Sequence, residues 1–435
     1  MNFQNVSEVF SSLGCLSIYS KELAPNDNSK NQVYVAGSFD VLNIFPIKEI
    51  ITDSSGTRKV QTFKASLNFY WILDDGTITE APKTQFILYP EYPEVRLSGF
   101  LSGCKNAPSE LMSTRLVGRI LLLGVNSDAK VFAYVAAPDS SIANWYRENK
   151  IAADVSVFQK HNLREDNSRL NLINKLTEIH LKGWTNSVRL NSDGNIVDCN
   201  APQCGGYTLE AHLGIKPNGF AEPDFEGWEV KQFGVKDFYK LNSSVITLMT
   251  PEPTGGYYTD KGVDFFLHKY GYADKRGRED RINFGGIFKS GVLNNQTGLT
   301  MNVIGFDPLS CKITNASEGR IALVDKAGND AASWSFSSLI KHWNRKHNQA
   351  CYVPSRTRTQ EIKQYSYGSN VLMGDGTDFF LFLNQLAQGN IYYDPAVKME
   401  NVSSNGKIKR RSQFRIKSLG LHGLYHRFES LSLIK

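Results

Sequence analysis

Four residues within one short stretch of the chain have the types and spacing needed to bind a metal ion and activate water. Residues 205–232 read GGYTLEAHLGIKPNGFAEPDFEGWEVKQ and contain Glu210, Asp224, Glu229 and Lys231. Mg²⁺ prefers oxygen ligands and keeps several waters, so two carboxylates and a substrate phosphate suffice to bind it. A neighbouring ammonium group can then orient the attacking water or stabilise charge on phosphorus. The spacing predicts a hydrolytic site in which Asp224 and Glu229 bind the metal and Lys231 positions the nucleophile.

A short helix is expected to carry Glu210. Thr208 is a candidate N-cap, the helix would end near Gly214, and Glu210 would lie in its first turn. His212 lies on the same helix, but a histidine in such a place more often packs or caps than binds a metal.

A hairpin is expected to carry the other three residues. Glu226-Gly227 is typical of a turn, and residues 228–233 alternate like a strand. The alternation directs Glu229 and Lys231 to one face, and the apolar residues between them into a core. Asp224 would then meet Glu229 across the hairpin.

The amino-acid sequence of this stretch resembles that of a known class of enzymes. GGYTLEAHLGI followed by EPDFEGWEVKQ is similar to the PD-(D/E)xK nucleases, and within them to the MvaI/BcnI restriction endonuclease family and its MutH and Sau3AI relatives. The resemblance implies Mg²⁺-dependent hydrolysis of double-stranded DNA, with Glu210 as an outer or second-metal carboxylate. The alternative is an exposed strand with an ordinary Glu–Lys pair.

Length and charge favour two domains, one of which binds a polyanion. The chain has 435 residues, of which 41% are apolar. Residues 1–150 carry 14 Lys and Arg against 15 Asp and Glu, whereas residues 151–435 carry 35 against 28. The basic excess therefore lies entirely in the part with the carboxylate site. No Walker-type phosphate loop is present, so we expect no use of ATP.

The cysteines and the N-terminus favour a protein of the bacterial cytoplasm. No cysteine pair has the spacing of a zinc site, and we expect ordinary thiols. The six are Cys15, Cys104, Cys199, Cys204, Cys311 and Cys351. The N-terminus lacks the basic and apolar segments of a leader peptide, and no apolar run has membrane-spanning length. We expect a soluble protein that does not bind membranes.

Residues 1–150 are expected to be rich in strands. Apolar residues at helical spacing from Val6 to Leu13 predict one helix, and a second, short helix is expected near Val41–Ile44. Asp75-Gly76 predicts a hairpin turn. Seven runs predict strands: Leu16–Ser20, Gln32–Ala36, Val60–Leu73, Thr79–Leu88, Glu94–Phe100, Arg119–Val125 and Lys130–Ala136. This pattern predicts a closed or nearly closed β-barrel.

This half also resembles a DNA-binding module. Tyr19–Asp27, Gln32–Val35 and Phe45-Pro46 are similar to the N-terminal effector domain of EcoRII-type restriction endonucleases. That domain is a B3-like pseudobarrel that grips a second copy of the recognition sequence with two arms, here Lys21–Asn31 and Arg96–Arg115. Asn and Arg can pair bidentately with adenine and guanine. The candidate contacts are Lys21, Asn26, Asp27, Lys30, Arg96, Lys105 and Arg115. The alternative is a polar surface loop with turn residues at Asn26-Asp27.

The remainder of the chain is expected to be a linker, residues 151–166, and an α/β catalytic domain, residues 167–435. Apolar positions from Leu170 to Ile179 predict a helix that ends at Lys182-Gly183. Four later segments continue the resemblance to the MvaI/BcnI family: Ile246–Gly255, Ser333–Ile340, Gly389–Asp394 and Gln413–Ile416. The resemblance implies a mixed sheet flanked by helices.

A basic run is expected to contact DNA. Residues 401–417 contain no acid and six bases: Lys407, Lys409, Arg410, Arg411, Arg415 and Lys417. Alternation places Arg415 and Lys417 on one face, and we expect Arg415 to read guanine through bidentate bonds. Residues 407–411 are expected to touch phosphates. Asp394 is a candidate acceptor for a cytosine amino group, or it closes a strand end. A charge run alone is more often a solvated face.

The sequence as a whole predicts a two-domain type II restriction endonuclease of the IIE kind, with residues 1–150 binding a second DNA site. The two resemblances together imply the target CCWGG (W = A or T) and a monomer. Two alternatives remain. One is a MutH-like nickase, against which the appended domain and the Asp-x4-Glu-x-Lys spacing argue. The other is a non-catalytic B3-type DNA-binding regulator, in which a complete carboxylate–lysine set has no use.

Overall fold

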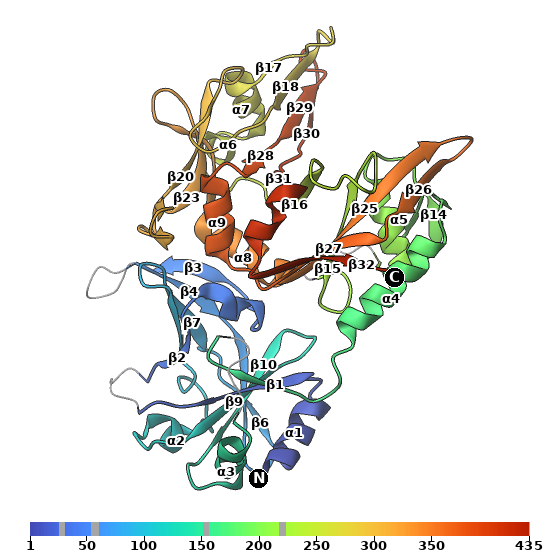
Figure 1. Cartoon of the computed structure of the whole chain (residues 1–435). Coiled ribbons are helices and arrows are strands. Elements are labelled where there is room, and N and C mark those ends of the chain that lie inside the picture. Colours follow the sequence, from blue (N-terminus) through green and yellow to red (C-terminus); the bar gives the residue numbers. More distant parts are fainter. Residues whose placement is uncertain (26–30, 54–60, 151–155, 217–222, 435) are drawn as a thin grey trace. The chain divides into compact units, whose positions relative to one another are not determined.

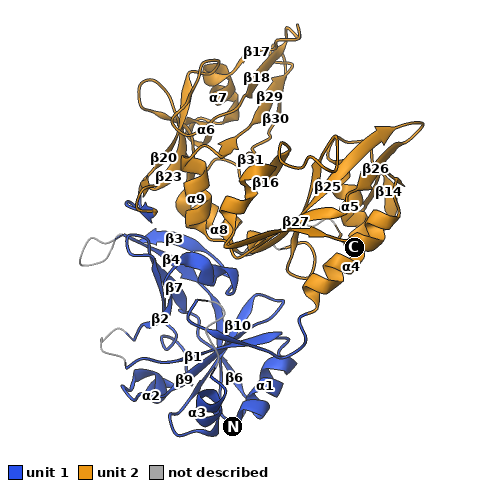
Figure 2. Cartoon of the chain, in the orientation of Figure 1, with its two compact units in different colours: residues 1–166, 312–317 blue, residues 167–311, 318–435 orange. Residues whose placement is uncertain are grey.

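The chain consists of two compact units. The computed structural model describes residues 1–25, 31–53, 61–150, 156–216 and 223–434 (Figure 1). Unit 1 comprises Met1–Asp166 and Lys312–Ser317, and unit 2 comprises Asn167–Cys311 and Glu318–Lys435 (Figure 2). Within the described ranges, no helix is both long and apolar enough to cross a membrane.

Most of the described strands of unit 1 belong to two sheets. The six-stranded sheet has the order β11 (Gln159–Asn162), β1 (Ser17–Glu22), β9 (Ile120–Val125), β10 (Lys130–Ala136), β5 (Asn68–Ile72) and β6 (Ile78–Glu80). The five-stranded sheet has the order β2 (Val33–Ala36), β8 (Glu94–Ser98), β7 (Gln85–Tyr89), β4 (Thr62–Ser66) and β3 (Ile50–Asp53).

The expectation of a closed barrel is wrong for the described strands. The predicted run Val60–Leu73 bends at the buried Leu67, so that β4 joins one sheet and β5 the other. The run Thr79–Leu88 divides in the same way, because residues 81–84 form a connection between β6 and β7. Two predicted strands thus pass from sheet to sheet, and neither sheet closes on itself.

The helices of unit 1 are short. They are α1 (Phe3–Ser12), η1 (Phe39–Asn43), α2 (Ser109–Ser113) and α3 (Ser141–Glu148). The two predicted helices are confirmed: Val6 and Phe10 of α1 are buried against the six-stranded sheet, and Gly14 adopts a φ of 83° just after the helix. This left-handed conformation suits glycine and ends the helix.

Part of the expected linker belongs to unit 1. β11 pairs antiparallel with β1, and the Leu163 N–H donates to the Leu16 carbonyl. The side chain of Phe158 is completely buried and lies edge-on to Phe45. Burial of this aromatic ring holds residues 156–163 on the sheet, so the described part of the segment is not a free connection.

Unit 2 is organised around one mixed sheet. Its order is β12 (Thr185–Asn186), β26 (Lys363–Tyr367), β25 (Gln349–Thr359), β27 (Asn370–Asp375) and β32 (Arg427–Ser432), and β15 (Glu229–Gly234) pairs in parallel with β25. Helices α4 (Ser168–Leu181) and α5 (Cys204–Leu213) share a core with this sheet. Leu172, Leu176 and Ile179 of α4 are buried as predicted, but Leu170 is 55% exposed.

Smaller sheets complete unit 2. They are β13–β14, β16–β31–β28, β17–β18–β29–β30 and β19–β20–β23–β24. Their strands are β13 (Val188–Leu190), β14 (Ile196–Asp198), β16 (Val245–Met249), β31 (Phe414–Lys417), β28 (Ile391–Tyr393), β17 (Tyr272–Ala273), β18 (Arg281–Gly285), β29 (Ala396–Glu400), β30 (Lys407–Lys409), β19 (Leu293–Asn294), β20 (Leu299–Ile304), β23 (Arg320–Val324) and β24 (Asp330–Ser335). The remaining helices include α6 (Tyr257–Asp260), α7 (Val263–Tyr270), α8 (Phe336–His347), α9 (Phe379–Ala387) and η2 (Ser418–Leu424).

Candidate active site

A tight turn places Asp224 next to β15. Glu226 and Gly227 have φ angles of 45° and 91°, and Phe225 and Trp228 exchange two backbone hydrogen bonds of 2.9 and 2.8 Å. Positive φ at both central residues is the requirement of a two-residue hairpin turn of type I′. The predicted turn is confirmed.

The carboxyl groups of Asp224 and Glu229 lie together at the start of β15. Asp224 Oδ2 accepts a hydrogen bond of 3.2 Å from the Val230 N–H, which lies between Glu229 and Lys231 along the strand. Glu229 is only 2% exposed. Trp228 and Val230 pack into the core of unit 2, so the predicted alternation along the strand is confirmed.

Lys231 completes the cluster. Its Nζ donates to Glu229 Oε1 at 2.7 Å, and both side chains lie on the same face of β15. A second lysine, Lys346 from the end of α8, places its Nζ 3.5 Å from Glu229 Oε2. Two ammonium groups therefore flank a single buried carboxylate.

Helix α5 brings Glu210 towards these residues. The helix starts at Cys204 rather than at Thr208, so Glu210 lies in its second turn. Thr208 is not the N-cap, because its buried hydroxyl donates to the Val188 carbonyl (3.0 Å) and accepts from the Val188 N–H (3.1 Å). The helix ends at Gly214 (φ 76°), as predicted.

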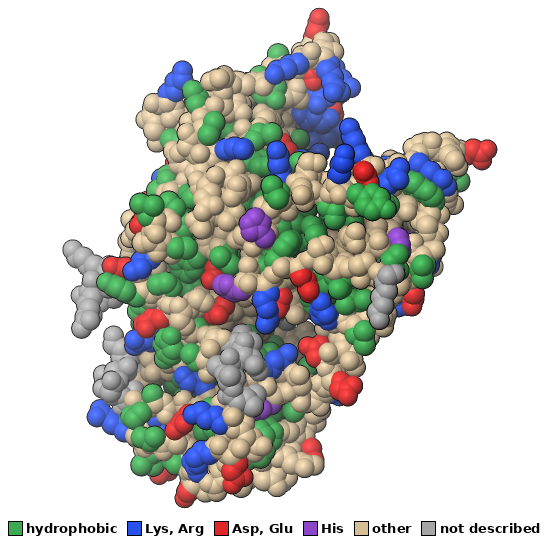
Figure 3. All heavy atoms as spheres, viewed as in Figure 1, with side chains coloured by type: hydrophobic (Ala, Val, Ile, Leu, Met, Phe, Trp, Pro, Cys, Tyr) green, Lys and Arg blue, Asp and Glu red, His purple; other side chains and the backbone are tan. Residues whose placement is uncertain are grey.

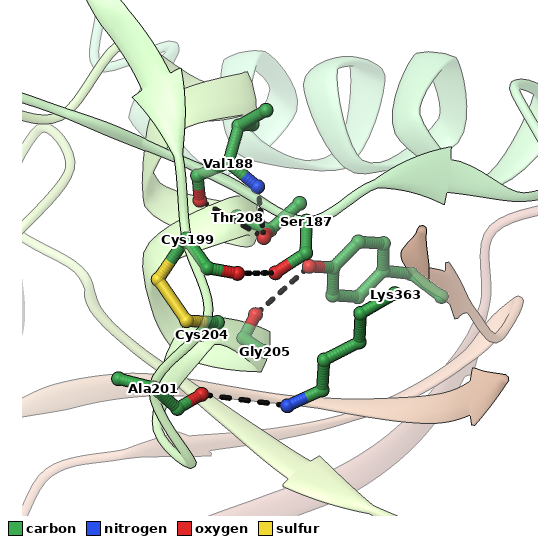
Figure 4. Close-up of a disulfide and its surroundings, with 9 residues drawn as sticks. Ser187, Val188, Cys199, Ala201, Cys204, Gly205, Thr208 and Lys363 are labelled. Atoms are coloured by element: carbon green, nitrogen blue, oxygen red, sulfur yellow. Dashed lines mark hydrogen bonds between the residues drawn. A yellow bond between two sulfur atoms is a disulfide. The ribbon is translucent and has the colours of Figure 1, made fainter. Parts of the chain in front are cut away.

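A disulfide fixes the first turn of α5. Cys199 and Cys204 are bonded (Figure 4), so the expectation of free thiols is wrong for this pair. The Ser187 hydroxyl donates to the Cys199 carbonyl at 2.6 Å, and the Tyr367 hydroxyl donates to the Gly205 carbonyl at 2.8 Å. The loop after β14 and the start of the Glu210 helix are thus joined covalently and through hydrogen bonds. The other four cysteines are free.

Burial and mutual repulsion set the protonation of the carboxyl groups. Burial, followed by the charge of Glu229, raises the pKa of Asp224 to about 7. The same two causes raise the pKa of Glu210. Burial also acts to raise the pKa of Glu229, but Lys231, His347 and Lys346 outweigh it and the net shift is downward. Glu229 is therefore the ionised member of the group, as a metal ligand must be.

The cluster fits a hard divalent cation. Glu229 Oε2 is buried and has no hydrogen-bond partner among the described residues. The pKa of Asp224 is raised by burial and because a second negative charge beside Glu229 is not neutralised by the protein. A bound cation would neutralise it. The described residues contain no group of three His, Cys, Asp or Glu side chains arranged for a metal. Two carboxylates suit Mg²⁺, which takes its other ligands from water and phosphate.

Arg415 and Asp394 also lie close together, at the paired strands β31 and β28. β31 pairs antiparallel with both β16 and β28, which matches the predicted strand segments 389–394 and 413–416. Arg415 Nη1 lies 2.6 Å from Asp394 Oδ2, and its Nε donates to Thr247 Oγ1 at 3.2 Å. Phe414 and Ile416 are buried while Lys417 is exposed, so the predicted alternation is confirmed.

The other bases of residues 401–417 are exposed. β30 carries Lys407 and Lys409, and Lys409 pairs with Glu400 at 3.2 Å. Arg410 and Arg411 follow on the surface. Lys and Arg side chains gather over β29 and β30 and near the β25–β26 hairpin in Figure 3. Arg356 and Arg358 of that hairpin lie over the rings of Phe238 and Trp184.

The candidate DNA contacts of unit 1 differ in solvent exposure and in their partners within the protein. Lys105 and Arg115 are exposed. Lys21 is buried and donates to the Tyr34 carbonyl, and burial lowers its pKa to about 8. Arg96 pairs with Glu94 at 2.9 Å. Asn26, Asp27 and Lys30 lie outside the described residues.

Sequence reasoning missed Arg119, which connects the two predicted arms. This buried side chain donates to the carbonyls of Ala24 (3.0 Å), Leu111 (2.6 Å) and Leu116 (2.8 Å). A cavity of about 180 Å³ lies here, and its lining includes Lys21, Arg96 and Arg119. Arg119 is the polar residue that opens an apolar strand run, which in the sequence is no more than an ordinary boundary.

Comparison with known proteins gives one family. A model of the MvaI/BcnI restriction endonuclease family matches residues 173–425, more than half of the chain. Two solved structures cover 62% of this chain: the MvaI–cognate DNA substrate complex (17% identity, 100% of that chain, TM-score 0.45) and MvaI in the absence of DNA (15% identity, 99% of that chain, TM-score 0.34). No curated protein matches.

Proposed function

This chain belongs to the MvaI/BcnI restriction endonuclease family, and from that membership we propose that it is a type II enzyme that hydrolyses double-stranded DNA with Mg²⁺ at the site of Asp224, Glu229 and Lys231. The observation that carries the proposal is the close cluster of these three side chains. Lys231 and Glu229 form an ion pair of 2.7 Å, and Asp224 accepts a hydrogen bond from the Val230 N–H between them, at the start of β15. The DNA partner is proposed by analogy with MvaI, whose structure holds cognate DNA.

Each side chain has a role in this chemistry. Asp224 and Glu229 would hold Mg²⁺, which when bound lowers the pKa of a water and offsets charge on the phosphate. Lys231 keeps Glu229 ionised through the bond to Oε1 and points to the same site, where it orients the attacking water. The water oxygen bonds to phosphorus and releases a proton to solvent, while the P–O bond to the sugar breaks and the sugar oxygen takes a proton from solvent. Glu210 acts as an outer carboxylate from α5.

Sequence recognition belongs to the β31–β28 pair and the bases beside it. Arg415 is fixed by Asp394 and Thr247, and its Nη2 has no hydrogen-bond partner among the described residues. The N–H donors of Arg415 Nη2 can therefore bind the acceptor atoms of a guanine base. The exposed Lys407, Arg410 and Arg411 can bind phosphates. The proposed target is CCWGG.

Unit 1 is proposed as an effector module with a B3-like fold. The exposed Lys105 and Arg115, together with the buried Arg119 that joins the two predicted arms, support binding of a second DNA copy. The enzyme would act as a monomer that binds two copies of its site.

Digestion of plasmid DNA with and without Mg²⁺ tests the proposal. We expect double-strand cleavage that requires Mg²⁺, with ends that map to CCWGG. Nicking confined to hemimethylated sites would instead support a MutH-like enzyme. Specific binding without cleavage under any divalent cation would support a DNA-binding regulator.

A further inference from the structure

A second lysine lies at the carboxylate cluster, on an element far away in the sequence. Lys346 Nζ is 3.5 Å from Glu229 Oε2, whereas Lys231 Nζ is 2.7 Å from Oε1. The two lysines differ in how they use their N–H donors. Lys231 makes a short hydrogen bond, but Lys346 makes no hydrogen bond with any described residue, and Glu229 Oε2 remains without one.

Pairing of strands explains why Lys346 reaches this place. β25 begins at Gln349, just after α8, and runs parallel to β15 with Ala350 opposite Glu229. The end of α8 therefore lies beside the start of β15, where Asp224 and Glu229 meet. This position follows from the main sheet of unit 2 and not from a surface loop.

Buried aromatic residues hold the last turn of α8. Trp343 is completely buried, and its Nε1 donates to Thr377 Oγ1 (3.2 Å) and to the Asp378 carbonyl (3.1 Å). The ring of His347 stacks on Trp343 at 4.3 Å, and its Nε2 lies 3.1 Å from the Leu248 carbonyl. Because the residues on either side are fixed, the backbone of Lys346 is fixed as well.

The side chain of Lys346 is only partly buried. The Lys346 side chain is 26% exposed, while that of Glu229 is 3% exposed. A lysine that served only to neutralise Glu229 would be expected to make a short hydrogen bond with its carboxylate, as Lys231 does. Lys346 instead stays 3.5 Å from Glu229 Oε2 and makes no hydrogen bond with any described residue, so its N–H donors remain available to a ligand.

We propose that Lys346 is a second catalytic lysine, whose ammonium group binds a non-bridging oxygen of the scissile phosphate. The inference rests on the proposed nuclease function. As the water oxygen bonds to phosphorus and releases a proton to solvent, the P–O bond to the sugar breaks and the sugar oxygen takes a proton from solvent; negative charge grows on the non-bridging oxygens during this step. Lys346 donates hydrogen bonds to that charge and keeps its proton throughout, so it is neither acid nor base.

Single-turnover cleavage of a cognate duplex tests this role, with Lys346→Ala and Lys346→Arg compared with Lys341→Ala. Lys341 is an exposed lysine of the same helix, so its loss matches the change in net charge. We expect Lys346→Ala to slow cleavage at saturating Mg²⁺ about 10²–10³-fold, the typical effect of removing one donor to a developing oxyanion. Lys346→Arg should recover part of the rate, and Lys341→Ala should cleave as the wild type does.

Two further readouts separate a catalytic role from a structural one. Affinity for the cognate duplex without a divalent cation, and the rise in melting temperature on adding Mg²⁺ without DNA, should both stay close to wild type in Lys346→Ala. Loss of the Mg²⁺-induced stabilisation together with cleavage would overturn the inference, since Lys346 would then act only through Glu229. If the alanine variant does not fold, Lys346→Gln replaces it.

A Lys346 variant without the ammonium group that cleaves at the wild-type rate would also overturn the inference. That result would leave the nuclease function intact, because the wild type still cleaves. A wild-type protein that cleaves no DNA would instead contradict the function itself.

Discussion

Arg415 on β31 and Asp394, which directly follows the paired strand β28, form an ion pair with 2.6 Å between Nη1 and Oδ2. Both side chains are about a quarter exposed, and Thr247 holds the Nε of the same guanidinium group. Asp394 therefore has a partner within the protein, which favours it as the residue that orients Arg415 over a direct contact to cytosine. A fixed Arg loses less side-chain entropy when it binds a base.

Replacement of Arg415 by Ala should reduce discrimination at one base pair. Loss of a bidentate guanine contact costs about 1–3 kcal/mol in the ratio of cognate to non-cognate binding. Asp394→Asn should lose part of the same discrimination, because the guanidinium group stays but its anchor is weakened. Binding is measured by gel shift on the cognate duplex and on single-base variants of it.

Lys409→Ala is the control for Arg415, because it removes a base from the neighbouring β30. We expect this variant to bind all sequences more weakly. The slope of the logarithm of the binding constant against the logarithm of salt concentration should become shallower by about one. Equal losses on cognate and random DNA for Arg415→Ala would rule out its base-reading role.

Asp224→Asn should stabilise the metal-free protein at neutral and higher pH. The pKa of Asp224 is raised from 3.8 to about 7, so the folded state binds more protons than the unfolded state between these values. The stability of the wild type therefore falls as the pH rises from about 4 through about 7. Asparagine does not titrate, and its side-chain oxygen can still accept from the Val230 N–H.

Thermal melts in EDTA from pH 4.5 to 8 measure this effect. The melting temperature of the variant relative to the wild type should rise with pH and level off above about pH 7. Mg²⁺ at pH 8 should stabilise the wild type more than the variant. A difference that does not change with pH would contradict the shifted carboxyl group.

The sequence was sufficient for the hairpin because the information there is local. Glu226-Gly227 specifies a turn, and alternation after it specifies which side chains face the core. Lys346 could not be found in this way, because only the parallel pairing of β25 with β15 brings it to Glu229. The start of α5 was missed for a related reason. Thr208 has the type of an N-cap, but its hydroxyl bonds to Val188, which is distant in sequence.

Reduction of the Cys199–Cys204 disulfide should lower the stability of unit 2 without abolishing cleavage. The bond closes a loop of only a few residues, for which chain entropy gives about 2 kcal/mol. We expect a reductant to lower the melting temperature of the wild type by a few degrees, and to leave a variant with both Cys199→Ser and Cys204→Ser unchanged. An equal shift in the two proteins would assign the effect to other cysteines.

A second DNA copy bound to unit 1 should accelerate cleavage. A coupling of about 1–3 kcal/mol is typical, so plasmids with two sites should be cut about 5–150-fold faster than plasmids with one. A short cognate duplex added in trans should rescue the one-site plasmid. Combined Lys105→Ala and Arg115→Ala should remove this stimulation, whereas Lys150→Ala, outside both arms, should retain it. Equal rates on one-site and two-site plasmids would contradict the effector role.

The central claim is that the cluster at the start of β15 hydrolyses DNA, and cleavage by Asp224→Ala and Lys231→Ala tests it most directly. With Mg²⁺ and a cognate duplex, the wild type should cut, and neither variant should cut at a measurable rate. Both variants should still shift the cognate duplex in a gel, because the proposed base and phosphate contacts lie on β31, β30 and the residues beside them. Cleavage at the wild-type rate by either variant, or loss of specific binding together with cleavage in both, would contradict the claim.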